Sequence, residues 1–391
     1  MRIAVFSDTY PPFINGVSTS TYNLVHTLLD HGHDVLVVAP RPDDGPLYIK
    51  DNIVYIPGIE LKKLYGYRSV TTPVNKILDI VKKFKPDVIH NQTDFFVGIY
   101  SKIIAKKLGV PIVYTYHTSY EDYTYYATHG YFDRIARKTV RIYSQNVANN
   151  STEFITPSIK TKEYMRSSGS DIYINVIPTG IDFSLFSDDK FDKERAKQFK
   201  KDHNIDEDTK IFLILGRIAQ EKSMDVSING FAKYHQEFPN EKIHLIVVGN
   251  GPQKPELEAL VDNLGINDIV SFIGAVPASE VPFYYHLADI YTSASITETQ
   301  GLTFMEAMSS GAIVLARFDS NLSETIIDND TGFFFIDEDE FVVKAHRILH
   351  MSSDELQHIK NRSYQIIDQY SIEKFYQRIL NTYERAIKKY W

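Results

Sequence analysis

The sequence contains no cysteine, which excludes a disulfide scaffold, a thiolate zinc site and a cysteine nucleophile, and which is typical of a reducing compartment. It also lacks any run approaching the ~20 apolar residues of a membrane-spanning helix. The first residues, MRIAVFSDTYPPF, hold only a short apolar run before Asp8 and do not fit a signal peptide. We therefore expect a cytoplasmic protein whose contact with a membrane is peripheral.

The length and the charge distribution predict two domains with different partners. At 391 residues the chain is longer than one hydrophobic core usually supports. Residues 1–185 contain 20 Lys+Arg against 17 Asp+Glu, whereas residues 186–391 contain 22 against 33. A mildly basic first half and an acidic second half suggest that each binds a different kind of molecule.

Short β-branched runs alternate with amphipathic stretches along the chain, which is typical of parallel sheets with crossover helices. Strand-like runs begin at residues 3, 35, 52, 87, 111, 153 and 174, and a second series begins at 211, 243, 269, 289 and 312. We predict an α/β protein with two Rossmann-like doubly wound domains, 1–185 and 186–370, facing a central cleft where such folds bind ligands.

The last segment, residues 371–391, has apolar residues at a helical period, at positions 372, 375, 379, 383 and 386. It predicts one long amphipathic helix, which we expect to pack back on the N-terminal domain.

The segment SITETQGLTFMEAM, residues 295–308, places Glu298 and Glu306 on either side of Gly301. A continuous helix would rotate the second carboxylate by about 80° from the first, and the glycine disfavours such a helix. We predict a loop followed by a helix from about Leu302, so that Glu298 precedes a helix N-terminus that favours anions. The two glutamates could form an acid/base pair, a metal cage or the two ends of a ligand grip, or could simply be solvated.

With its surroundings, this segment resembles a known family. ETQGLTFMEAM is similar to the E-x7-E signature of the retaining GT-B glycosyltransferases that use nucleotide sugars (family 4-like). GRIAQEKSMD resembles that family's diphosphate-binding segment, and VVGNGPQ at 247 and FIGAVP at 272 resemble its nucleotide-facing loops. The resemblance covers essentially the whole chain.

The resemblance implies a role for each glutamate. Glu298 would contact the transferred hexose, and Glu306 would bind the ribose hydroxyls. Glu298 could instead be a nucleophile, but retaining glycosidases set two carboxyls ~5 Å apart across one sugar bond, and a Glu306 committed to ribose disfavours that mechanism.

Arg217 and Lys222 have a physical role in such a transfer, because the departing nucleoside diphosphate builds negative charge that fixed cations stabilise. Without the glutamate signature they would read as a surface Arg and Lys in a turn. The resemblance implies His117, Arg217, Lys222 and Glu298 as catalytic residues. The implied donor-binding residues are Gly16, Gly216, Arg217, Lys222, Asn250, Gly251, Val276, Glu298, Gly301, Leu302, Thr303 and Glu306.

The first domain is expected to bind the acceptor. Gly16 follows the first strand and would let the backbone approach a phosphate, although a strand-to-helix turn alone could require it. The family often has glycine where this chain has Asn15, and NGVS resembles the branch that glucosylates diacylglycerol or transfers mannose to lipids. We assign Asn15, His117 and Tyr120 to the acceptor.

Residues 114–133 carry seven tyrosines around His117 and His129. The resemblance places His117 at the active site, whereas His129 reads as an ordinary loop histidine. The tyrosines suit sugar stacking or a lipid headgroup boundary, but a packed loop would also hold them.

Residues 60–109 contain ten Lys+Arg and four Asp+Glu, and RIARKTVRIYSQ at 134 adds a basic face. Such a surface could bind anionic lipid or could simply be solvated. Nucleic acid is disfavoured by the acidic total. The D-x-D matches at 206, 328 and 337 lie in acidic turns, and the resemblance implies no essential metal.

We interpret the chain as a retaining hexosyltransferase, peripheral on the inner face of the cell membrane, that moves glucose from UDP-glucose to diacylglycerol. The resemblance is strongest to bacterial 1,2-diacylglycerol 3-alpha-glucosyltransferases. Alternatives are another donor, such as GDP-mannose or UDP-galactose, a soluble acceptor, or a non-catalytic sugar-binding protein.

Overall fold

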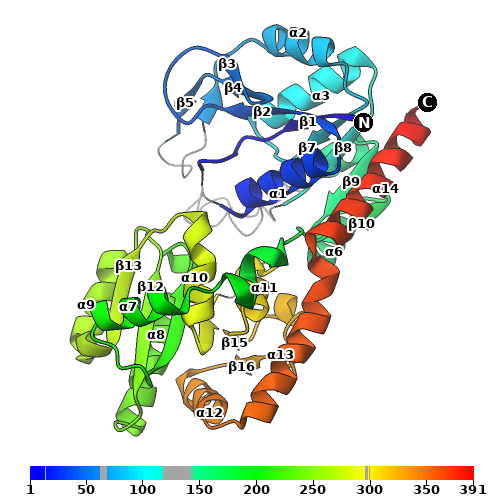
Figure 1. Cartoon of the computed structure of the whole chain (residues 1–391). Helices are drawn as coiled ribbons and strands as arrows, with labels where there is room; N and C mark the ends of the chain where they lie inside the picture. Colours follow the sequence, from blue (N-terminus) through cyan, green and yellow to red (C-terminus); the bar gives the residue numbers. More distant parts are fainter. Residues whose placement is uncertain (14, 62–67, 118–141, 143, 296–297, 299) are drawn as a thin grey trace. The chain divides into compact units, whose positions relative to one another are not determined.

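The computed structural model describes residues 1–13, 15–61, 68–117, 142, 144–295, 298 and 300–391. The chain forms two compact units (Figure 1). Unit 1 comprises Met1–Gly180 together with Ile372–Trp391, and unit 2 comprises Ile181–Ser371. Among the described residues, no helix has the length and apolar character that crossing a bilayer requires.

Unit 1 is built on an eight-stranded sheet in the order β10-β9-β8-β7-β1-β2-β4-β3. Its pairs are parallel except for β3 with β4. The strands are β1 (Arg2–Phe6), β2 (Asp34–Pro40), β3 (Tyr48–Lys50), β4 (Ile53–Ile56), β7 (Val88–Asn91), β8 (Ile112–Thr115), β9 (Glu153–Thr156) and β10 (Ile174–Val176). The helices with described bounds are α1 (Gly16–Asp30), α2 (Val74–Phe84), α3 (Phe96–Leu108), α6 (Ile159–Ser167) and α14 (Ile372–Tyr390).

The central strand β1 is apolar and buried from Ile3 to Phe6 because both faces of the sheet are covered. Ile3 and Val5 belong to a cluster with residues of α1 and α14, whereas Ala4 and Phe6 belong to a second cluster with residues of α2 and α3. The seven strands predicted for this half are all present. The short strands β3, β5 (Gly58–Glu60) and β6 (Arg68–Val70) were not predicted.

The amphipathic helix predicted at the end of the chain is confirmed as α14, and it packs within unit 1 against α1, β7, β8 and β9. Its apolar stripe includes Phe375, Ile379 and Tyr383, all buried in the unit 1 core. A Cβ atom at Gly180 would lie 2.5 Å from that of Phe375, so this contact requires glycine.

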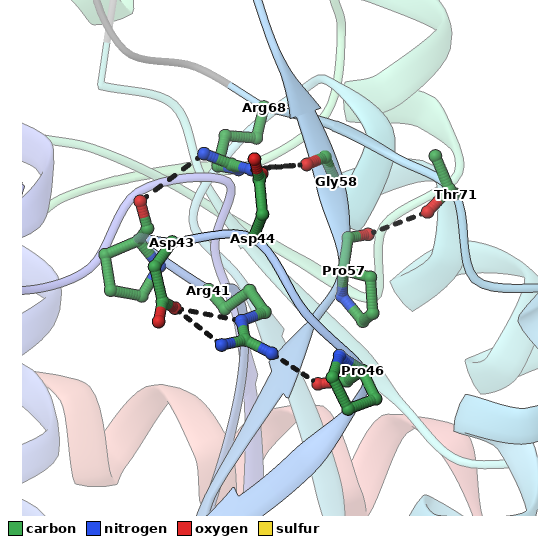
Figure 2. Close-up of polar contacts among 9 residues, drawn as sticks. Arg41, Asp43, Asp44, Pro46, Pro57, Gly58, Arg68 and Thr71 are labelled. Atoms are coloured by element: carbon green, nitrogen blue, oxygen red, sulfur yellow. Dashed lines mark hydrogen bonds and ion pairs between the residues drawn. The ribbon is translucent and has the colours of Figure 1, made fainter.

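Two buried arginines organise the segment that follows β2 (Figure 2). Arg41 donates from Nε to Asp43 at 2.9 Å and from Nη1 to the Pro46 carbonyl at 2.7 Å. Arg68 donates from Nε to the Gly58 carbonyl at 3.1 Å and pairs with Asp44. These contacts join the segment to the antiparallel hairpin of β5 (Gly58–Glu60) and β6 (Arg68–Val70).

Unit 2 is a six-stranded, fully parallel sheet in the order β13-β12-β11-β14-β15-β16. The strands are β11 (Lys210–Leu215), β12 (Ile243–Val248), β13 (Val270–Gly274), β14 (Ile290–Ser293), β15 (Ile313–Arg317) and β16 (Phe333–Phe335). The helices are α7 (Lys193–Asp202), α8 (Met224–Glu237), α9 (Lys254–Leu264), α10 (Val281–Leu287), α11 (Leu302–Ser309), α12 (Glu338–Leu349) and α13 (Ser353–Ile367). Numbered within the unit, this is the 3-2-1-4-5-6 order of Rossmann folds.

Candidate functional site

The strand order of unit 2 identifies where its ligand site lies. In such sheets ligands bind outside the carboxyl ends of the strands, where the strand order reverses. Here the reversal falls between β11 and β14, which pair directly. The segment after β11 carries Gly216, Arg217 and Lys222, and the segment after β14 carries Glu298. These four residues predicted for the donor therefore follow the two strands at this edge, whereas the predicted donor residue Gly16 belongs to unit 1.

Glycines bring the loops at this edge together backbone against backbone. A Cβ atom on Gly249 would lie 1.8 Å from the carbonyl oxygen of Gly216, and one on Gly251 would lie 2.0 Å from that of Ile218. The amide of Ile218 donates to the carbonyl of Asn250 at 3.0 Å. The loops after β11 and β12 thus form one rigid surface that larger residues would push apart.

Lys222 and Glu298 are in direct contact, with the ammonium nitrogen 2.7 Å from a carboxylate oxygen. The Glu298 side chain is 12% exposed and that of Lys222 31%. The carbonyl of Glu298 also accepts a hydrogen bond from the side-chain amide of Asn321. Each side chain therefore fixes the other at the switch point of the sheet.

Arg217 lies in the same loop and forms an ion pair with Glu221. Its side chain is 43% exposed, so the guanidinium is accessible to solvent on at least one side. Together with Lys222 it places two cations after β11, which is a charge pattern suited to a diphosphate.

Glu306 lies on α11, where its carboxylate accepts a hydrogen bond from the hydroxyl of Tyr285 at 3.0 Å. Burial raises the pKa of this carboxyl to about 7, and the Tyr285 hydrogen bond opposes the rise. Tyr291 is fully buried, and both Glu298 and Glu306 help to raise its pKa. The two glutamates lie in different segments of unit 2, and both raise the pKa of the same tyrosine.

Helix α11 begins at Leu302, as predicted, and Gly301 is its N-cap residue with a left-handed φ of 72°. A Cβ atom at Gly301 would lie 2.5 Å from Leu322, so the turn requires glycine for space as well as for conformation. Among the described residues, no side chain caps the start of this helix at Leu302 and Thr303. Its first amides and its dipole favour an anion.

Of the remaining donor candidates, Asn250 is exposed and Val276 is partly buried. The side-chain oxygen of Asn250 accepts from the amide of Gly251 at 2.8 Å, and Val276 packs on the unit 2 core. Both are in loops that follow strands of the same sheet, β12 and β13.

In unit 1 the structure gives Asn15 a structural role. Asn15 is the N-cap of α1: its side-chain oxygen accepts from the amide of Ser18 at 2.9 Å, and its amide group donates to the Thr9 hydroxyl at 2.8 Å. A Cβ atom at Gly16 would have no described atom within 4 Å. The helix therefore starts beside open space, although one of its amides is already used by the cap.

His117 belongs to a hydrogen-bonded chain that sequence reasoning did not find. Its Nε2 lies 2.7 Å from the carbonyl oxygen of the Gln92 side chain, which only accepts, so Nε2 carries the proton and Nδ1 does not. Burial lowers the pKa of His117 to about 4. This histidine is accordingly neutral at physiological pH.

The chain continues into the core of unit 1. The Gln92 amide donates to Nε2 of His90 at 2.9 Å, so His90 carries its proton on Nδ1 and donates it to the Tyr383 hydroxyl at 2.6 Å. Burial lowers the pKa of His90 to about 3. A residue of the C-terminal helix thereby supports His117 through two intermediates.

Several sequence-based assignments lie outside the described residues. They are Tyr120, His129, most of the tyrosine-rich segment, the basic stretch at 134 and residues 62–67. Within the described part, sequence reasoning missed Gln92, Tyr285, Tyr291 and Asn321, which contact the predicted residues but carry no spacing signature.

The three D-x-D matches each contact protein groups. Asp206 and Asp208 both pair with Lys242 at 3.0 Å. In the second match Asp328 pairs with Lys344 and Asp330 with Arg362. In the third match Asp337 caps α12 and Asp339 pairs with Lys233.

Comparisons with known proteins cover both units. Residues 14–185 match the model of Glycosyltransferase Family 4, and residues 195–366 match that of Glycosyl transferases group 1. The alpha-monoglucosyldiacylglycerol synthase of Acholeplasma laidlawii is 33% identical over 88% of this chain and 86% of its own length. The synthase of the same name from Streptococcus pneumoniae is 32% identical over 99% and 86%.

Solved structures show the same fold at lower identity. Anabaena HepE in complex with UDP and glucose superposes with a TM-score of 0.76 at 17% identity, covering 98% of this chain and 99% of that one. Sucrose-phosphate synthase from Thermosynechococcus elongatus superposes with a TM-score of 0.74 at 20% sequence identity, covering 98% of each chain.

Proposed function

We propose, from the premise that the chain belongs to the group 1 and family 4 glycosyltransferases, that it transfers glucose from UDP-glucose to diacylglycerol with retention of configuration. It is a hexosyltransferase whose relatives of 32–33% identity are named for glycolipid synthesis. The choice of acceptor and of glucose rests on those relatives. The donor site rests on the geometry of unit 2.

The observation that carries the proposal is the contact of Lys222 with Glu298 at the switch point of the sheet. A largely buried carboxylate that accepts from a lysine is suited to orient sugar hydroxyls on one side and to keep the ammonium aimed at a diphosphate on the other. Arg217 adds a second cation in the same loop. The helix start at Leu302 completes the phosphate-binding surface with backbone amides.

In the proposed mechanism the acceptor hydroxyl attacks the anomeric carbon from the face that the diphosphate leaves. The bond from the anomeric carbon to the phosphate oxygen breaks, the new glycosidic bond forms, and the departing phosphate oxygen takes the hydroxyl proton. Arg217 and Lys222 stabilise the charge that develops on UDP. Glu306 binds the ribose hydroxyls. His117, which stays neutral, contacts the transferred sugar and the acceptor.

We propose that these cations neutralise the diphosphate without an essential metal ion. The fixed charge of Arg217 and Lys222 is present in the loop itself, and the acidic pairs that resemble a metal clamp contact lysine, arginine or backbone groups. Activity should therefore persist in excess EDTA.

Unit 1 is proposed to bind the lipid acceptor at an anionic membrane surface. The last turn of α2 carries Lys82 and Lys83, and that of α3 carries Lys106 and Lys107. Each basic residue near an anionic leaflet contributes about 1 kcal/mol. On this proposal the enzyme acts at the inner face of the cell membrane.

The test is turnover of purified protein with diacylglycerol vesicles and, separately, UDP-glucose, UDP-galactose and GDP-mannose, followed by assignment of the product anomer by NMR. An α-linked glucosyl lipid supports the proposal. Turnover with only another donor replaces the glucose assignment, and turnover with only a soluble acceptor refutes the lipid assignment.

A further inference from the structure

A second cluster of chemistry-bearing side chains lies in unit 2, on different elements from the donor residues. It consists of His346 on the last turn of α12, His350 at the C-cap of that helix, and Glu241 in the turn between α8 and β12. One ligand atom from each lies within 4.8 Å of the other two. From this cluster we infer that the chain binds one zinc-like divalent cation here.

The two histidines are four residues apart on one helical turn, so their rings project on the same side, as in helical zinc motifs. Their ring centroids are 4.1 Å apart. The ring of Phe238 stacks on His346 at 4.2 Å and holds its plane. Tetrahedral zinc with bonds of ~2.0–2.1 Å sets its ligand atoms about 3.3 Å apart. His350 and Glu241 are already at this separation, and the ligand atom of His346 lies within 4.8 Å of both. Small rotations of these partly exposed side chains would bring it to the same separation.

The hydrogen bonding of His350 directs one of its ring nitrogens toward Glu241. Nδ1 of His350 donates to the carbonyl of His346 at 2.9 Å. The other ring nitrogen, Nε2, lies 3.1 Å from a carboxylate oxygen of Glu241. A ring nitrogen that donates to a carbonyl while its partner binds metal is the usual support of a zinc ligand.

The lysine next to Glu241 in the sequence pairs with other carboxylates. The neighbouring Lys242 contacts Asp206 and Asp208 instead. Two imidazoles and one carboxylate favour zinc, copper or nickel over calcium or magnesium, and a water molecule would complete a tetrahedron.

The ion would stabilise the fold and would not take part in transfer. It would join the turn after α8 to the end of α12, and these two helices already pack together. Lys222 lies two residues before the start of α8. The helix has 14 residues and is therefore about 20 Å long. The cation site therefore lies at the opposite end of that helix from the donor residues.

The experiment is isothermal titration of the full chain with zinc chloride at pH 7.5, with thermal unfolding in zinc and in EDTA. We expect one site per chain, a higher Tm in zinc, and at least about tenfold weaker binding in His350→Ala, because even a lost supporting hydrogen bond costs 10–100-fold in affinity. His358→Ala, an exposed histidine on α13, is the matched control and should bind as the wild type does.

UDP-glucose binding serves as the folding control, and it should be unchanged in both variants. Cobalt(II) titration adds a spectroscopic readout, since a tetrahedral nitrogen and oxygen site absorbs more strongly in the visible than an octahedral one. No binding to the wild type, equal binding in His350→Ala, or loss in His358→Ala alone would each overturn the inference and leave an ordinary histidine–glutamate ion pair.

Discussion

The pKa of Glu306 predicts a specific dependence of donor affinity on pH. The carboxyl has a raised pKa of about 7 because it is buried, and only its ionised form accepts hydrogen bonds from both ribose hydroxyls. At pH 6 about one carboxyl in ten is ionised, and at pH 8 about nine in ten. We therefore expect UDP-glucose to bind about tenfold more weakly at pH 6 than at pH 8.

The same group predicts an opposite effect on stability. Its folded pKa lies above the usual 4.5, so its contribution favours the folded state at low pH and is lost as pH rises through 7. The difference amounts to at most about 3 kcal/mol at pH 8. Glu306→Gln should therefore raise the free energy of unfolding at pH 8 while it weakens donor binding and removes the pH dependence.

The assay is calorimetric titration with UDP-glucose between pH 6 and 8.5. This donor is chosen because its diphosphate is a diester, whereas the terminal phosphate of UDP titrates near pH 6. Tyr285→Phe removes the hydrogen bond that opposes the rise in the pKa of Glu306. In this variant the midpoint of the donor-affinity profile should therefore move to higher pH. The matched control is Glu258→Gln, which changes an exposed carboxylate on α9. A flat affinity in the wild type, or a wild-type profile in Glu306→Gln, would refute the ribose assignment.

Four further predictions concern other residues. Gln92→Leu removes the acceptor that orients His117, so kcat in the vesicle assay should fall about 10–100-fold while UDP-glucose affinity stays unchanged; an unaltered kcat would contradict this positioning role. Lys222→Met should lower kcat by about 10²–10³, the usual cost of one charge-stabilising donor, and a smaller loss in single-turnover measurements would remove it from the mechanism. Arg68→Met should lower the free energy of unfolding, measured in urea, by about 1–3 kcal/mol, because the Gly58 carbonyl loses its hydrogen-bond donor. Asp44→Asn should cost under about 1 kcal/mol, because Asp44 is 94% exposed.

The sequence allowed much of the fold to be predicted. Twelve strand-like runs were recognised, and all are present because buried parallel strands are continuously apolar. The strands missed, such as β16 (Phe333–Phe335) and β3 (Tyr48–Lys50), are three residues long. Runs that short show no period, and their pairing is decided by neighbours distant in sequence.

The site was predictable only where its chemistry has a linear signature. Glu298 and Lys222 were predicted as site residues from their motifs, and the structure brings the two into contact. Tyr285 and Gln92 were missed, since each is one ordinary residue whose role depends on a partner elsewhere in the chain. Asn15 illustrates the converse, because a residue next to a motif glycine is used to cap a helix.

The position of α14 has a consequence for how the protein is made. Unit 1 contains the first 180 residues but also needs residues 372–391, which the ribosome adds after all of unit 2. Unit 2 is continuous in sequence, so it can fold during synthesis, whereas the first half waits with an uncovered sheet face for its last helix. A premature stop shortly before residue 372 would therefore spare the donor half and damage the half encoded earliest, including the partner of His90 at Tyr383.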